Sequence, residues 1–399
     1  MEVADKRATM AEHHQETGRA MKKIAACAFA ALICTAPAWG GETGENTSAG
    51  YPSYPSGSAV TIYGLIDQGV EFVNNVPTGK TTSNAVREGA GTATSYFGMR
   101  GSEDLGGGTH AIFDLQAGFA PNTGSSLQGG RLFGRQSYVG LDGPYGRLTF
   151  GRQYTMRFFA NHEGNPFGTG AQGLTTLDNG FANARADNAV SYRVHLGGFE
   201  AGLNYSFGRD TVVGTTSVAS DCPGETTPST ECREYSTLLK YEGKNWGITN
   251  SYERQYGGTS ATWGGLTSPK KTDSRFIISG HVDISKASIG AGWIRRDDEG
   301  IATPKSNLFW LSSKVRVMPS VSIDSMVAQL KYDGSPNKAL VLVLRGQYFL
   351  SKTTAVYLTG EHIKNGGKLA LSASNLSPVP GAVPGGSQIS IIAGIRHTF

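Results

Sequence analysis

From Ser58 to the last residue, apolar and polar side chains alternate in segments of nine to thirteen residues. In the first segment one face carries Val60, Ile62, Ile66 and Val70, and the other carries Thr61, Asp67 and Glu71. Alternation with a period of two is typical of a β-strand whose two faces meet different surroundings. Residues 58–399 are therefore predicted to fold as an all-β domain.

The connections between these segments alternate in length. Short turns lie at 105–108, 142–146, 197–198, 243–245, 284–286, 318–320 and 351–352. Longer loops lie at about 73–93, 120–130, 156–185, 208–233, 257–273, 297–304, 332–338 and 364–386. Seven turns and eight loops make sixteen strands. An even number of short strands, with turns at one end and loops at the other, indicates an antiparallel transmembrane β-barrel. The barrel must close, because hydrocarbon offers no hydrogen-bond partner to an open edge.

A soluble, secreted β-sandwich or solenoid is the alternative, since alternation alone fits both. Aromatic residues near strand ends favour the barrel, where they would form girdles at the membrane interfaces. They include Tyr63, Phe207, Trp246 and Trp293. The long third loop, 156–185, is unusual for a compact domain unless it has a function of its own. We expect it to fold into the barrel lumen and narrow it.

Residues 21–38 read as a signal peptide, with two lysines, an apolar stretch and small residues before the cleavage point. Residues 1–20 are then expected to be a non-native upstream extension, and 39–57 a short linker before the barrel at 58–399. The formal charge of +4 is too small to indicate a nucleic-acid partner.

Two cysteines remain in the mature chain, Cys222 and Cys232. Their spacing in a polar segment of an exported chain favours a local disulfide that closes an external loop. A metal site is the alternative, but no histidine or second cysteine pair lies near them.

Enzymatic motifs are not recognisable in the sequence. GKTTS at 79–83 lacks the upstream glycine of a phosphate-binding loop, and HEGNP, from His162, lacks the second histidine of a zinc protease. We predict no catalytic residue, no metal and no cofactor. A barrel enzyme of the outer membrane and a substrate-specific channel stay as alternatives to a diffusion channel.

Five segments resemble the corresponding parts of Gram-negative general diffusion porins, above all those of β-proteobacteria. They are SAVTIYGLIDQGV, SYFGMRGSEDLGGGTHAIFDLQAGF, GRQSYVGLDGPYGRLTFGRQYT, DNAVSYRV and the terminal AGIRHTF. The resemblance covers about 58–399. It implies a homotrimer of sixteen-stranded barrels in the outer membrane that passes small hydrophilic solutes. It also implies contacts with lipid and lipopolysaccharide, and recognition of Phe399 by the outer-membrane assembly machinery.

In that family, wall arginines face carboxylates of the third loop across the narrowest point of the pore. The resemblance places Arg135 and Arg185 at two wall positions. Strand alternation independently turns both toward the lumen, opposite Tyr138 and Tyr192 respectively. Arg131 shares the face of Arg135. For each arginine the alternative is an ordinary solvated charge in the lumen.

This chain departs from the family pattern at two points. Tyr96 stands where the family commonly has an arginine, and whether Arg100 or Arg152 joins the constriction stays open. On the loop, the family's Pro-Glu-Phe-Gly becomes Asn165, Pro166, Phe167 and Gly168, so its glutamate is absent. Glu163 and Asp178 are left as the acids expected to face the arginines. With cations on the wall and few anions on the loop, we expect weak anion selectivity.

Overall fold

The computed structural model describes residues 54, 58–181, 184–210, 222–225, 227, 229–259, 264–376 and 379–399. The predicted upstream extension and signal peptide lie outside these residues, as does the linker except for Tyr54. Within the described ranges, no helix is long and apolar enough to cross a bilayer.

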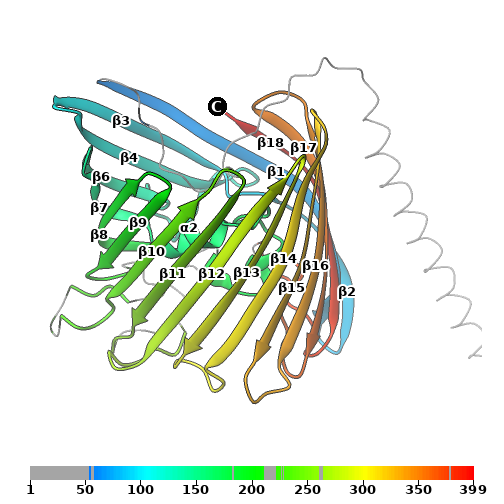
Figure 1. Cartoon of the computed structure of the whole chain (residues 1–399). Coiled ribbons are helices and arrows are strands. Elements are labelled where there is room, and N and C mark those ends of the chain that lie inside the picture. The colour runs from blue at the N-terminus through cyan, green and yellow to red at the C-terminus, as the bar shows by residue number, and fades with distance from the viewer. Residues whose placement is uncertain are drawn as a thin grey trace, which may run out of the picture. The chain divides into compact units, whose positions relative to one another are not determined.

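Sixteen antiparallel strands close into a barrel, as the sequence predicts (Figure 1). They are β1 (Ala59–Thr78), β3 (Tyr96–Gly106), β4 (Thr109–Ala120), β6 (Gln136–Gly143), β7 (Gly146–Tyr154), β8 (Arg185–Leu196), β9 (Phe199–Ser206), β10 (Glu234–Glu242), β11 (Trp246–Tyr256), β12 (Thr272–Ile284), β13 (Ala287–Asp298), β14 (Lys305–Met318), β15 (Val321–Tyr332), β16 (Lys338–Phe349), β17 (Thr354–Gly366) and β18 (Ser387–Thr398). Each pairs with the next, and β1 closes the ring by pairing with β3 on one edge and with β18 on the other.

Two additional short strands lie within the predicted loops. β2 (Thr81–Gly89) pairs with the far half of β1, and β5 (Ser125–Ser126) pairs with the end of β4. The expectation of an irregular loop at 73–93 was therefore wrong. Most side chains of β2 are exposed on both faces, so its sequence lacks the apolar alternation that reveals the membrane-spanning strands.

The two faces of the wall differ as predicted. On β1, Val60 and Ile62 are exposed on the outside, whereas Asp67 and Glu71 are fully buried on the inside. Outward aromatic rings gather in neighbouring strands, Phe199 with Tyr241 and Trp246 at the short-turn end and Phe276 with Trp293 and Phe309 nearer the long loops. Such groups are typical of membrane interfaces. Tyr63 does not join them, because it faces inward and donates a hydrogen bond to Asp114.

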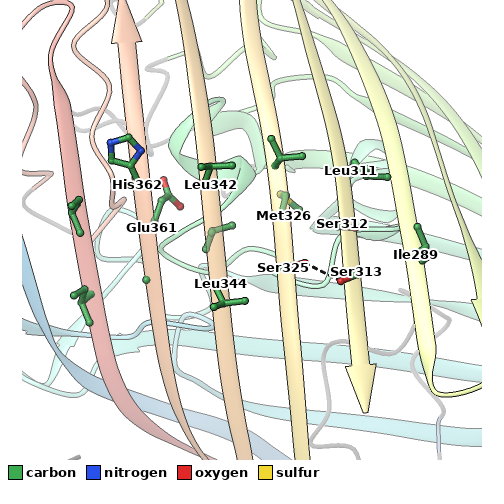
Figure 2. A pocket seen from close by; sticks show the side chains of 15 residues that line it. Ile289, Leu311, Ser312, Ser313, Ser325, Met326, Leu342, Leu344, Glu361 and His362 are labelled. Atoms are coloured by element: carbon green, nitrogen blue, oxygen red, sulfur yellow. Dashed lines mark hydrogen bonds between the residues drawn. The ribbon is translucent and has the colours of Figure 1, made fainter. Parts of the chain in front are cut away.

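The outer face of β14–β17 carries a shallow depression of about 750 Å³ (Figure 2). Small residues on neighbouring strands, Ser313, Ser325 and Gly360, form its floor, and Leu311, Leu342 and Leu344 rise beside them. The two serine hydroxyls hydrogen bond to each other at 2.9 Å. One hydroxyl therefore donates to the other within the wall, on a surface that faces hydrocarbon.

The third loop, defined here as residues 155–181 and 184, folds inside the barrel. It contains α2 (Met156–His162) and the 3-10 helices η1 (Leu174–Thr176) and η2 (Asn179–Phe181). α2 packs against the inner side of β9–β12 (Figure 1). Its first turn is fixed by the Thr155 hydroxyl, which donates to Glu253 at 2.7 Å, and by the Met156 N–H, which donates to Ser236 at 2.9 Å.

A hydrophobic core lies within the lumen, between the third loop and the wall. The loop contributes Met156, Phe167, Leu174, Leu177 and Phe181, and the wall contributes Ile277, Ile294, Leu308, Trp310, Met326, Val341 and Ile363. Burying one side chain of this size stabilises a fold by about 1.5–3 kcal/mol. The core therefore fixes the loop to the inner faces of β12–β17.

The backbone of the loop meets the wall closely at Gly164. Its carbonyl oxygen accepts hydrogen bonds from Trp310 Nε1 at 3.1 Å and from Ser312 Oγ at 2.7 Å. A β-carbon on Gly290 would lie 2.3 Å from that same oxygen. Glycine is thus required on both sides, and the backbone φ of +62° at Gly164 also favours it.

Candidate functional site

Five arginines gather on the inner wall that β3, β6, β7, β8 and the segment before β6 form. We call this set, Arg100, Arg131, Arg135, Arg152 and Arg185, the arginine cluster. It lies on the part of the wall that the hydrophobic core of the third loop does not cover.

Arg135 and Arg185 converge on one neutral oxygen. Arg135 Nη2 donates to the Tyr154 hydroxyl at 3.0 Å, and Arg185 Nη2 donates to the same atom at 2.8 Å. Arg135 also donates to Gln116 at 3.2 Å and stacks over the ring of Tyr96, 4.3 Å from its centroid. The Arg185 guanidinium lies 4.5 Å from the Tyr154 centroid. Cation–π contacts and neutral acceptors thus hold two positive charges side by side.

These contacts revise two expectations. The first concerns Tyr96, which stands where the family commonly has a wall arginine: its ring contacts the guanidinium of Arg135. Arg185 contacts Tyr154 on the inner wall and Tyr192 is exposed outside, as expected, but the alternation argument is wrong for Arg135. Tyr138 also faces the lumen, at 7% exposure, because Arg135 precedes the first residue of β6 and alternation does not apply there.

Arg131 and Arg152 share the carboxylate of Asp187, and Arg131 also contacts Asp210. Arg131 Nη2 lies 2.8 Å from Asp187 and 2.6 Å from Asp210, and Arg152 Nη1 lies 2.5 Å from the other oxygen of Asp187. Both aspartates are buried. Sequence reasoning missed them, although Asp187 stands two residues from Arg185 and shares its face by strand alternation.

Glu163 and Asp178 do not face the arginine cluster, contrary to expectation. Glu163 pairs with Lys240 at 2.8 Å and with His281, and Asp178 pairs with Arg275 at 2.9 Å. All three partners point inward from β10 or β12, on the wall that the loop covers. A buried carboxylate is stabilised only where a charged partner meets it, and these strands supply the partners.

Further contacts tie the third loop along its length to the same wall. Arg157 pairs with Glu253 at 2.7 Å, and the Gly173 N–H donates to Glu361 at 2.5 Å. Gln172 donates to the Ser390 hydroxyl at 2.8 Å. The loop is therefore fixed to the side of the lumen away from the arginine cluster.

Neighbouring charged groups also shift the pKa values of the two loop carboxylates, Glu163 and Asp178. Burial alone would raise the pKa of Glu163, but hydrogen bonds and charge from His281 and Lys240 hold it below its ordinary 4.5. Burial likewise opposes ionisation of Asp178, yet Arg275 and Arg296 hold the pKa of Asp178 well below its usual range.

Acid is therefore expected to loosen the loop. Because both folded-state pKa values are depressed, the anchoring is fully present above pH 4.5 and is lost as pH falls through the lower folded values. Single-channel recordings should be quiet at neutral pH and show added fluctuation only well below pH 4.5. A Glu163→Gln channel should fluctuate already at neutral pH. A Glu163→Gln channel that is as quiet at neutral pH as the natural protein would contradict this anchoring role.

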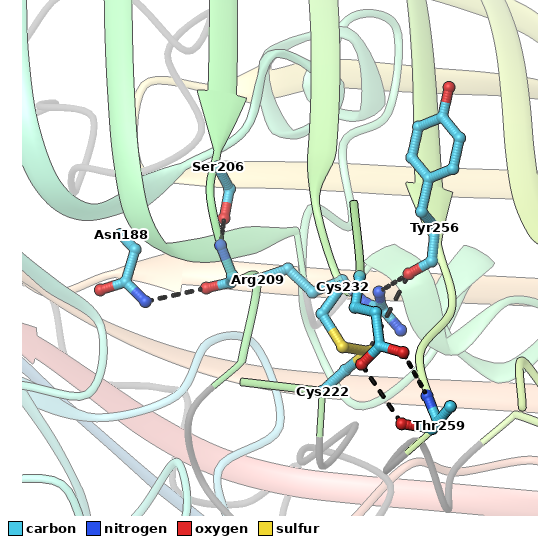
Figure 3. Close-up of a disulfide and its surroundings, with 9 residues drawn as sticks. Asn188, Ser206, Arg209, Cys222, Cys232, Tyr256 and Thr259 are labelled. Carbon is cyan, nitrogen blue, oxygen red and sulfur yellow. Dashed lines mark hydrogen bonds between the residues drawn. A yellow bond between two sulfur atoms is a disulfide. The ribbon is translucent and has the colours of Figure 1, made fainter. Parts of the chain in front are cut away.

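The remaining predicted residues are the cysteine pair and Phe399. Cys222 and Cys232 form the predicted disulfide, and both are buried (Figure 3). Among the residues that the structure describes, no group of side chains is arranged to hold a metal ion. Phe399 pairs through its backbone with Gly64 at 3.0 and 3.1 Å, and its ring is exposed on the outer face.

Comparisons with known proteins agree with this architecture. The sequence profile described as Gram-negative porin matches residues 24–368. An outer membrane porin protein of Bordetella pertussis is 28% identical over 358 residues, which are 77% of this chain and 89% of that protein. Outer membrane porin protein 32 of Delftia acidovorans is 29% identical over 363 residues, which are 86% of this chain and 94% of that protein.

Comparison with solved structures finds porins and other outer membrane proteins of similar fold. An anion-selective porin from Comamonas acidovorans superposes with a TM-score of 0.65 at 25% identity, covering 86% of this chain and 100% of that one. The trimer form of OmpT, an outer membrane protein of Vibrio cholerae, has a TM-score of 0.60 at 14% identity over 86% of this chain and 100% of its own, a likeness of fold alone.

Proposed function

The chain belongs to the family of Gram-negative porins, and on that premise we propose that it is a general diffusion channel with a weak preference for anions. Like its relatives, it is a channel of the outer membrane and not an enzyme. The preference for anions and the residues that produce it are the new part of this proposal.

One observation carries the proposal: Arg135 and Arg185 meet at the neutral hydroxyl of Tyr154. We infer that they line the constriction, with Tyr96 positioning Arg135 and Arg131 contributing from above. Glu163 and Asp178 define the opposite boundary by fixing the loop. Among the described residues, the five arginines of the cluster are accompanied by three acids that interact with them, Asp114, Asp187 and Asp210, and 5 − 3 = +2.

Fixed charge in a narrow channel with low-dielectric walls concentrates ions of the opposite sign. The anion-selective porin from Comamonas acidovorans, at 25% identity, supports the same preference here. In a planar bilayer under a potassium chloride gradient, the natural channel should favour chloride at 0.1 M salt. The preference should shrink at 1 M, because the Debye length falls from about 10 Å to about 3 Å. A preference for potassium at low salt would contradict the proposal.

A substrate-specific channel is the second candidate, favoured by the inward tyrosines beside the arginines. Tyr63, Tyr96 and Tyr138 all face the lumen on this wall. General diffusion predicts solute flux that rises in proportion to concentration in liposomes. Saturating flux of an aromatic carboxylate, with proportional flux of a neutral sugar, would instead favour the specific channel.

We further propose that the protein assembles as a homotrimer, and that the assembly machinery recognises Phe399, whose ring is exposed. The family membership supports both. A monomeric mass by light scattering in mild detergent, with full conductance, would contradict the trimer. Wild-type amounts of inserted barrel after deletion of Phe399 would contradict its recognition.

Lipopolysaccharide is the outer-leaflet lipid that we infer as a partner. Lys331 and Lys338 are adjacent across β15 and β16, and Lys364 lies on β17; all three are exposed near the long-loop end. Each lysine near an anionic lipid surface contributes about 1 kcal/mol. Replacing all three with Gln should reduce the lipopolysaccharide that copurifies with the barrel, and an unchanged amount would contradict this site.

A further inference from the structure

The two disulfide-bonded cysteines hydrogen bond to the backbone of Arg209 and Asp210. The N–H and the carbonyl of Asp210 pair with Cys222 at 3.3 and 3.2 Å, and the N–H of Arg209 donates to the carbonyl of Cys232 at 3.0 Å. The bond from Cys222 to Cys232 thus joins the two segments that flank residues 209 and 210 (Figure 3). This short segment is held from both sides.

The surrounding segments leave little room for the backbone to shift. The Glu225 N–H donates to the Phe207 carbonyl at 3.2 Å. A β-carbon on Gly208 would lie 1.7 Å from the carbonyl oxygen of Pro223, so the two segments meet backbone to backbone. On the far side, the Cys232 N–H donates to the Gly257 carbonyl at 3.0 Å. The disulfide therefore closes a compact layer above β9–β11.

The side chain of Asp210 reaches from this layer to the arginine cluster. Its carboxylate lies 2.6 Å from Arg131, which also contacts Asp187 at 2.8 Å. Asp187 in turn contacts Arg152 at 2.5 Å. With Asp210 in place, two arginines and two aspartates balance, 2 − 2 = 0. Without Asp210 the same group carries 2 − 1 = +1.

We propose that Asp210 is a selectivity-determining residue of the pore and that the Cys222–Cys232 disulfide is what positions it. The inference rests on the proposed function, in that it assumes that ions pass the arginine cluster. Asp210 limits the positive charge that passing ions meet, and the disulfide holds it there. The disulfide thereby sets the strength of the channel's ion preference as well as the shape of an external loop.

The test compares reversal potentials in a potassium chloride gradient at 0.1 M salt. Asp210→Asn should raise the chloride-to-potassium permeability ratio about twofold, as expected for one unit charge removed several ångströms from the ion path in water. Replacing both cysteines with Ala should shift the ratio in the same direction. Combining the three substitutions should add little to Asp210→Asn, because both changes remove the same contact.

Two matched variants separate a specific role from a general one. Asp210→Glu keeps the charge and should keep the wild-type ratio. Glu225→Gln removes the same charge from the neighbouring exposed segment, and its ratio should also stay at the wild-type value. All shifts should shrink at 1 M salt, where the Debye length is about 3 Å.

Three results would overturn the inference. An unchanged ratio for Asp210→Asn removes its role in selectivity, and an equal shift for Glu225→Gln shows that any loop charge acts alike. A wild-type ratio in the cysteine-free channel shows that the disulfide does not position Asp210. If that variant fails to form a heat-resistant barrel, reducing wild-type channels after insertion gives the same comparison. Each variant's permeability ratio is compared with the wild-type ratio. The test of Asp210 is therefore valid whichever ion the natural channel prefers.

Discussion

A channel in which Arg135 and Arg185 are both replaced by Gln is expected to lose its preference for chloride. The two guanidinium groups share one tyrosine hydroxyl, so the substitutions remove two positive charges from one place. A unit charge about 4 Å from an ion in water is worth about 1 kcal/mol. We therefore expect the chloride-to-potassium permeability ratio at low salt to fall about two- to fivefold, as measured by reversal potential.

Two control variants accompany this experiment. Arg295→Gln removes an arginine that pairs with Asp333 near the long-loop end of β13, and it should leave the ratio unchanged. Tyr154→Phe keeps both charges but removes the hydroxyl to which they donate, so its effect should be smaller than that of the double substitution. An unchanged reversal potential in the double variant would mean that these arginines do not line the ion path.

Substituting Ala for Gly290 is expected to displace the third loop from the wall. The new methyl group would lie 2.3 Å from the carbonyl oxygen of Gly164, which is backbone and has little freedom to yield. Overpacking of this kind costs about 1–3 kcal/mol. The loop can move only away from β13, into the remaining lumen, so single-channel conductance should fall and become noisier.

Gly346→Ala is the matched control, because a β-carbon there meets nothing within 4 Å. It should leave conductance and noise at wild-type values. If Gly290→Ala also conducts like the natural channel, then either the contact at Gly164 is not close or the loop does not bound the pore. Protease sensitivity of the loop in the same variant distinguishes the two cases.

The barrel could be predicted from the sequence because its determinants are local. A period of two, strands of about ten residues and alternating connection lengths each follow from neighbouring residues. The prediction was wrong at 73–93, where β1 and β2 continue as an exposed hairpin. Polar residues on both faces carry no alternation, so the sequence gives no indication of a strand there.

The candidate site could be predicted only in part. Arg185 lies in β8 and faces the lumen as expected, although β8 has a bulge between Ala186 and Ala189 that the sequence did not indicate. Arg135 lies before β6 and required the resemblance. The partners of Glu163 and Asp178 come from strands more than seventy residues away. The loop lies on one side of the lumen because of contacts that form only when distant strands close the barrel. No local sequence pattern encodes those contacts.

One usable signal was overlooked. Segments such as ALVLVL at 339–344 are apolar on both faces, although only one face of a barrel strand meets lipid. Val341 and Val343 face inward and are buried, and Val341 lies in the core that includes Phe167 and Leu174 of the third loop. Strands that are apolar on both faces thus indicate where an inward loop is attached.

The central claim is that ions pass between the third loop and the arginine cluster, and not between the loop and β10–β17. Single cysteines at two positions test it directly. Arg185 is half-buried beside the proposed path, whereas Ile294 is 2% exposed beneath the loop. The disulfide partners Cys222 and Cys232 offer no free thiol of their own.

Charged methanethiosulfonate reagents are applied to each variant during bilayer recording. In Arg185→Cys, the positively charged reagent should restore the chloride preference and the negatively charged reagent should reverse it. Ile294→Cys should not respond to either reagent, because the loop covers it. Rapid block of Ile294→Cys, with no response of Arg185→Cys, would place the ion path on the other side of the loop and contradict the account.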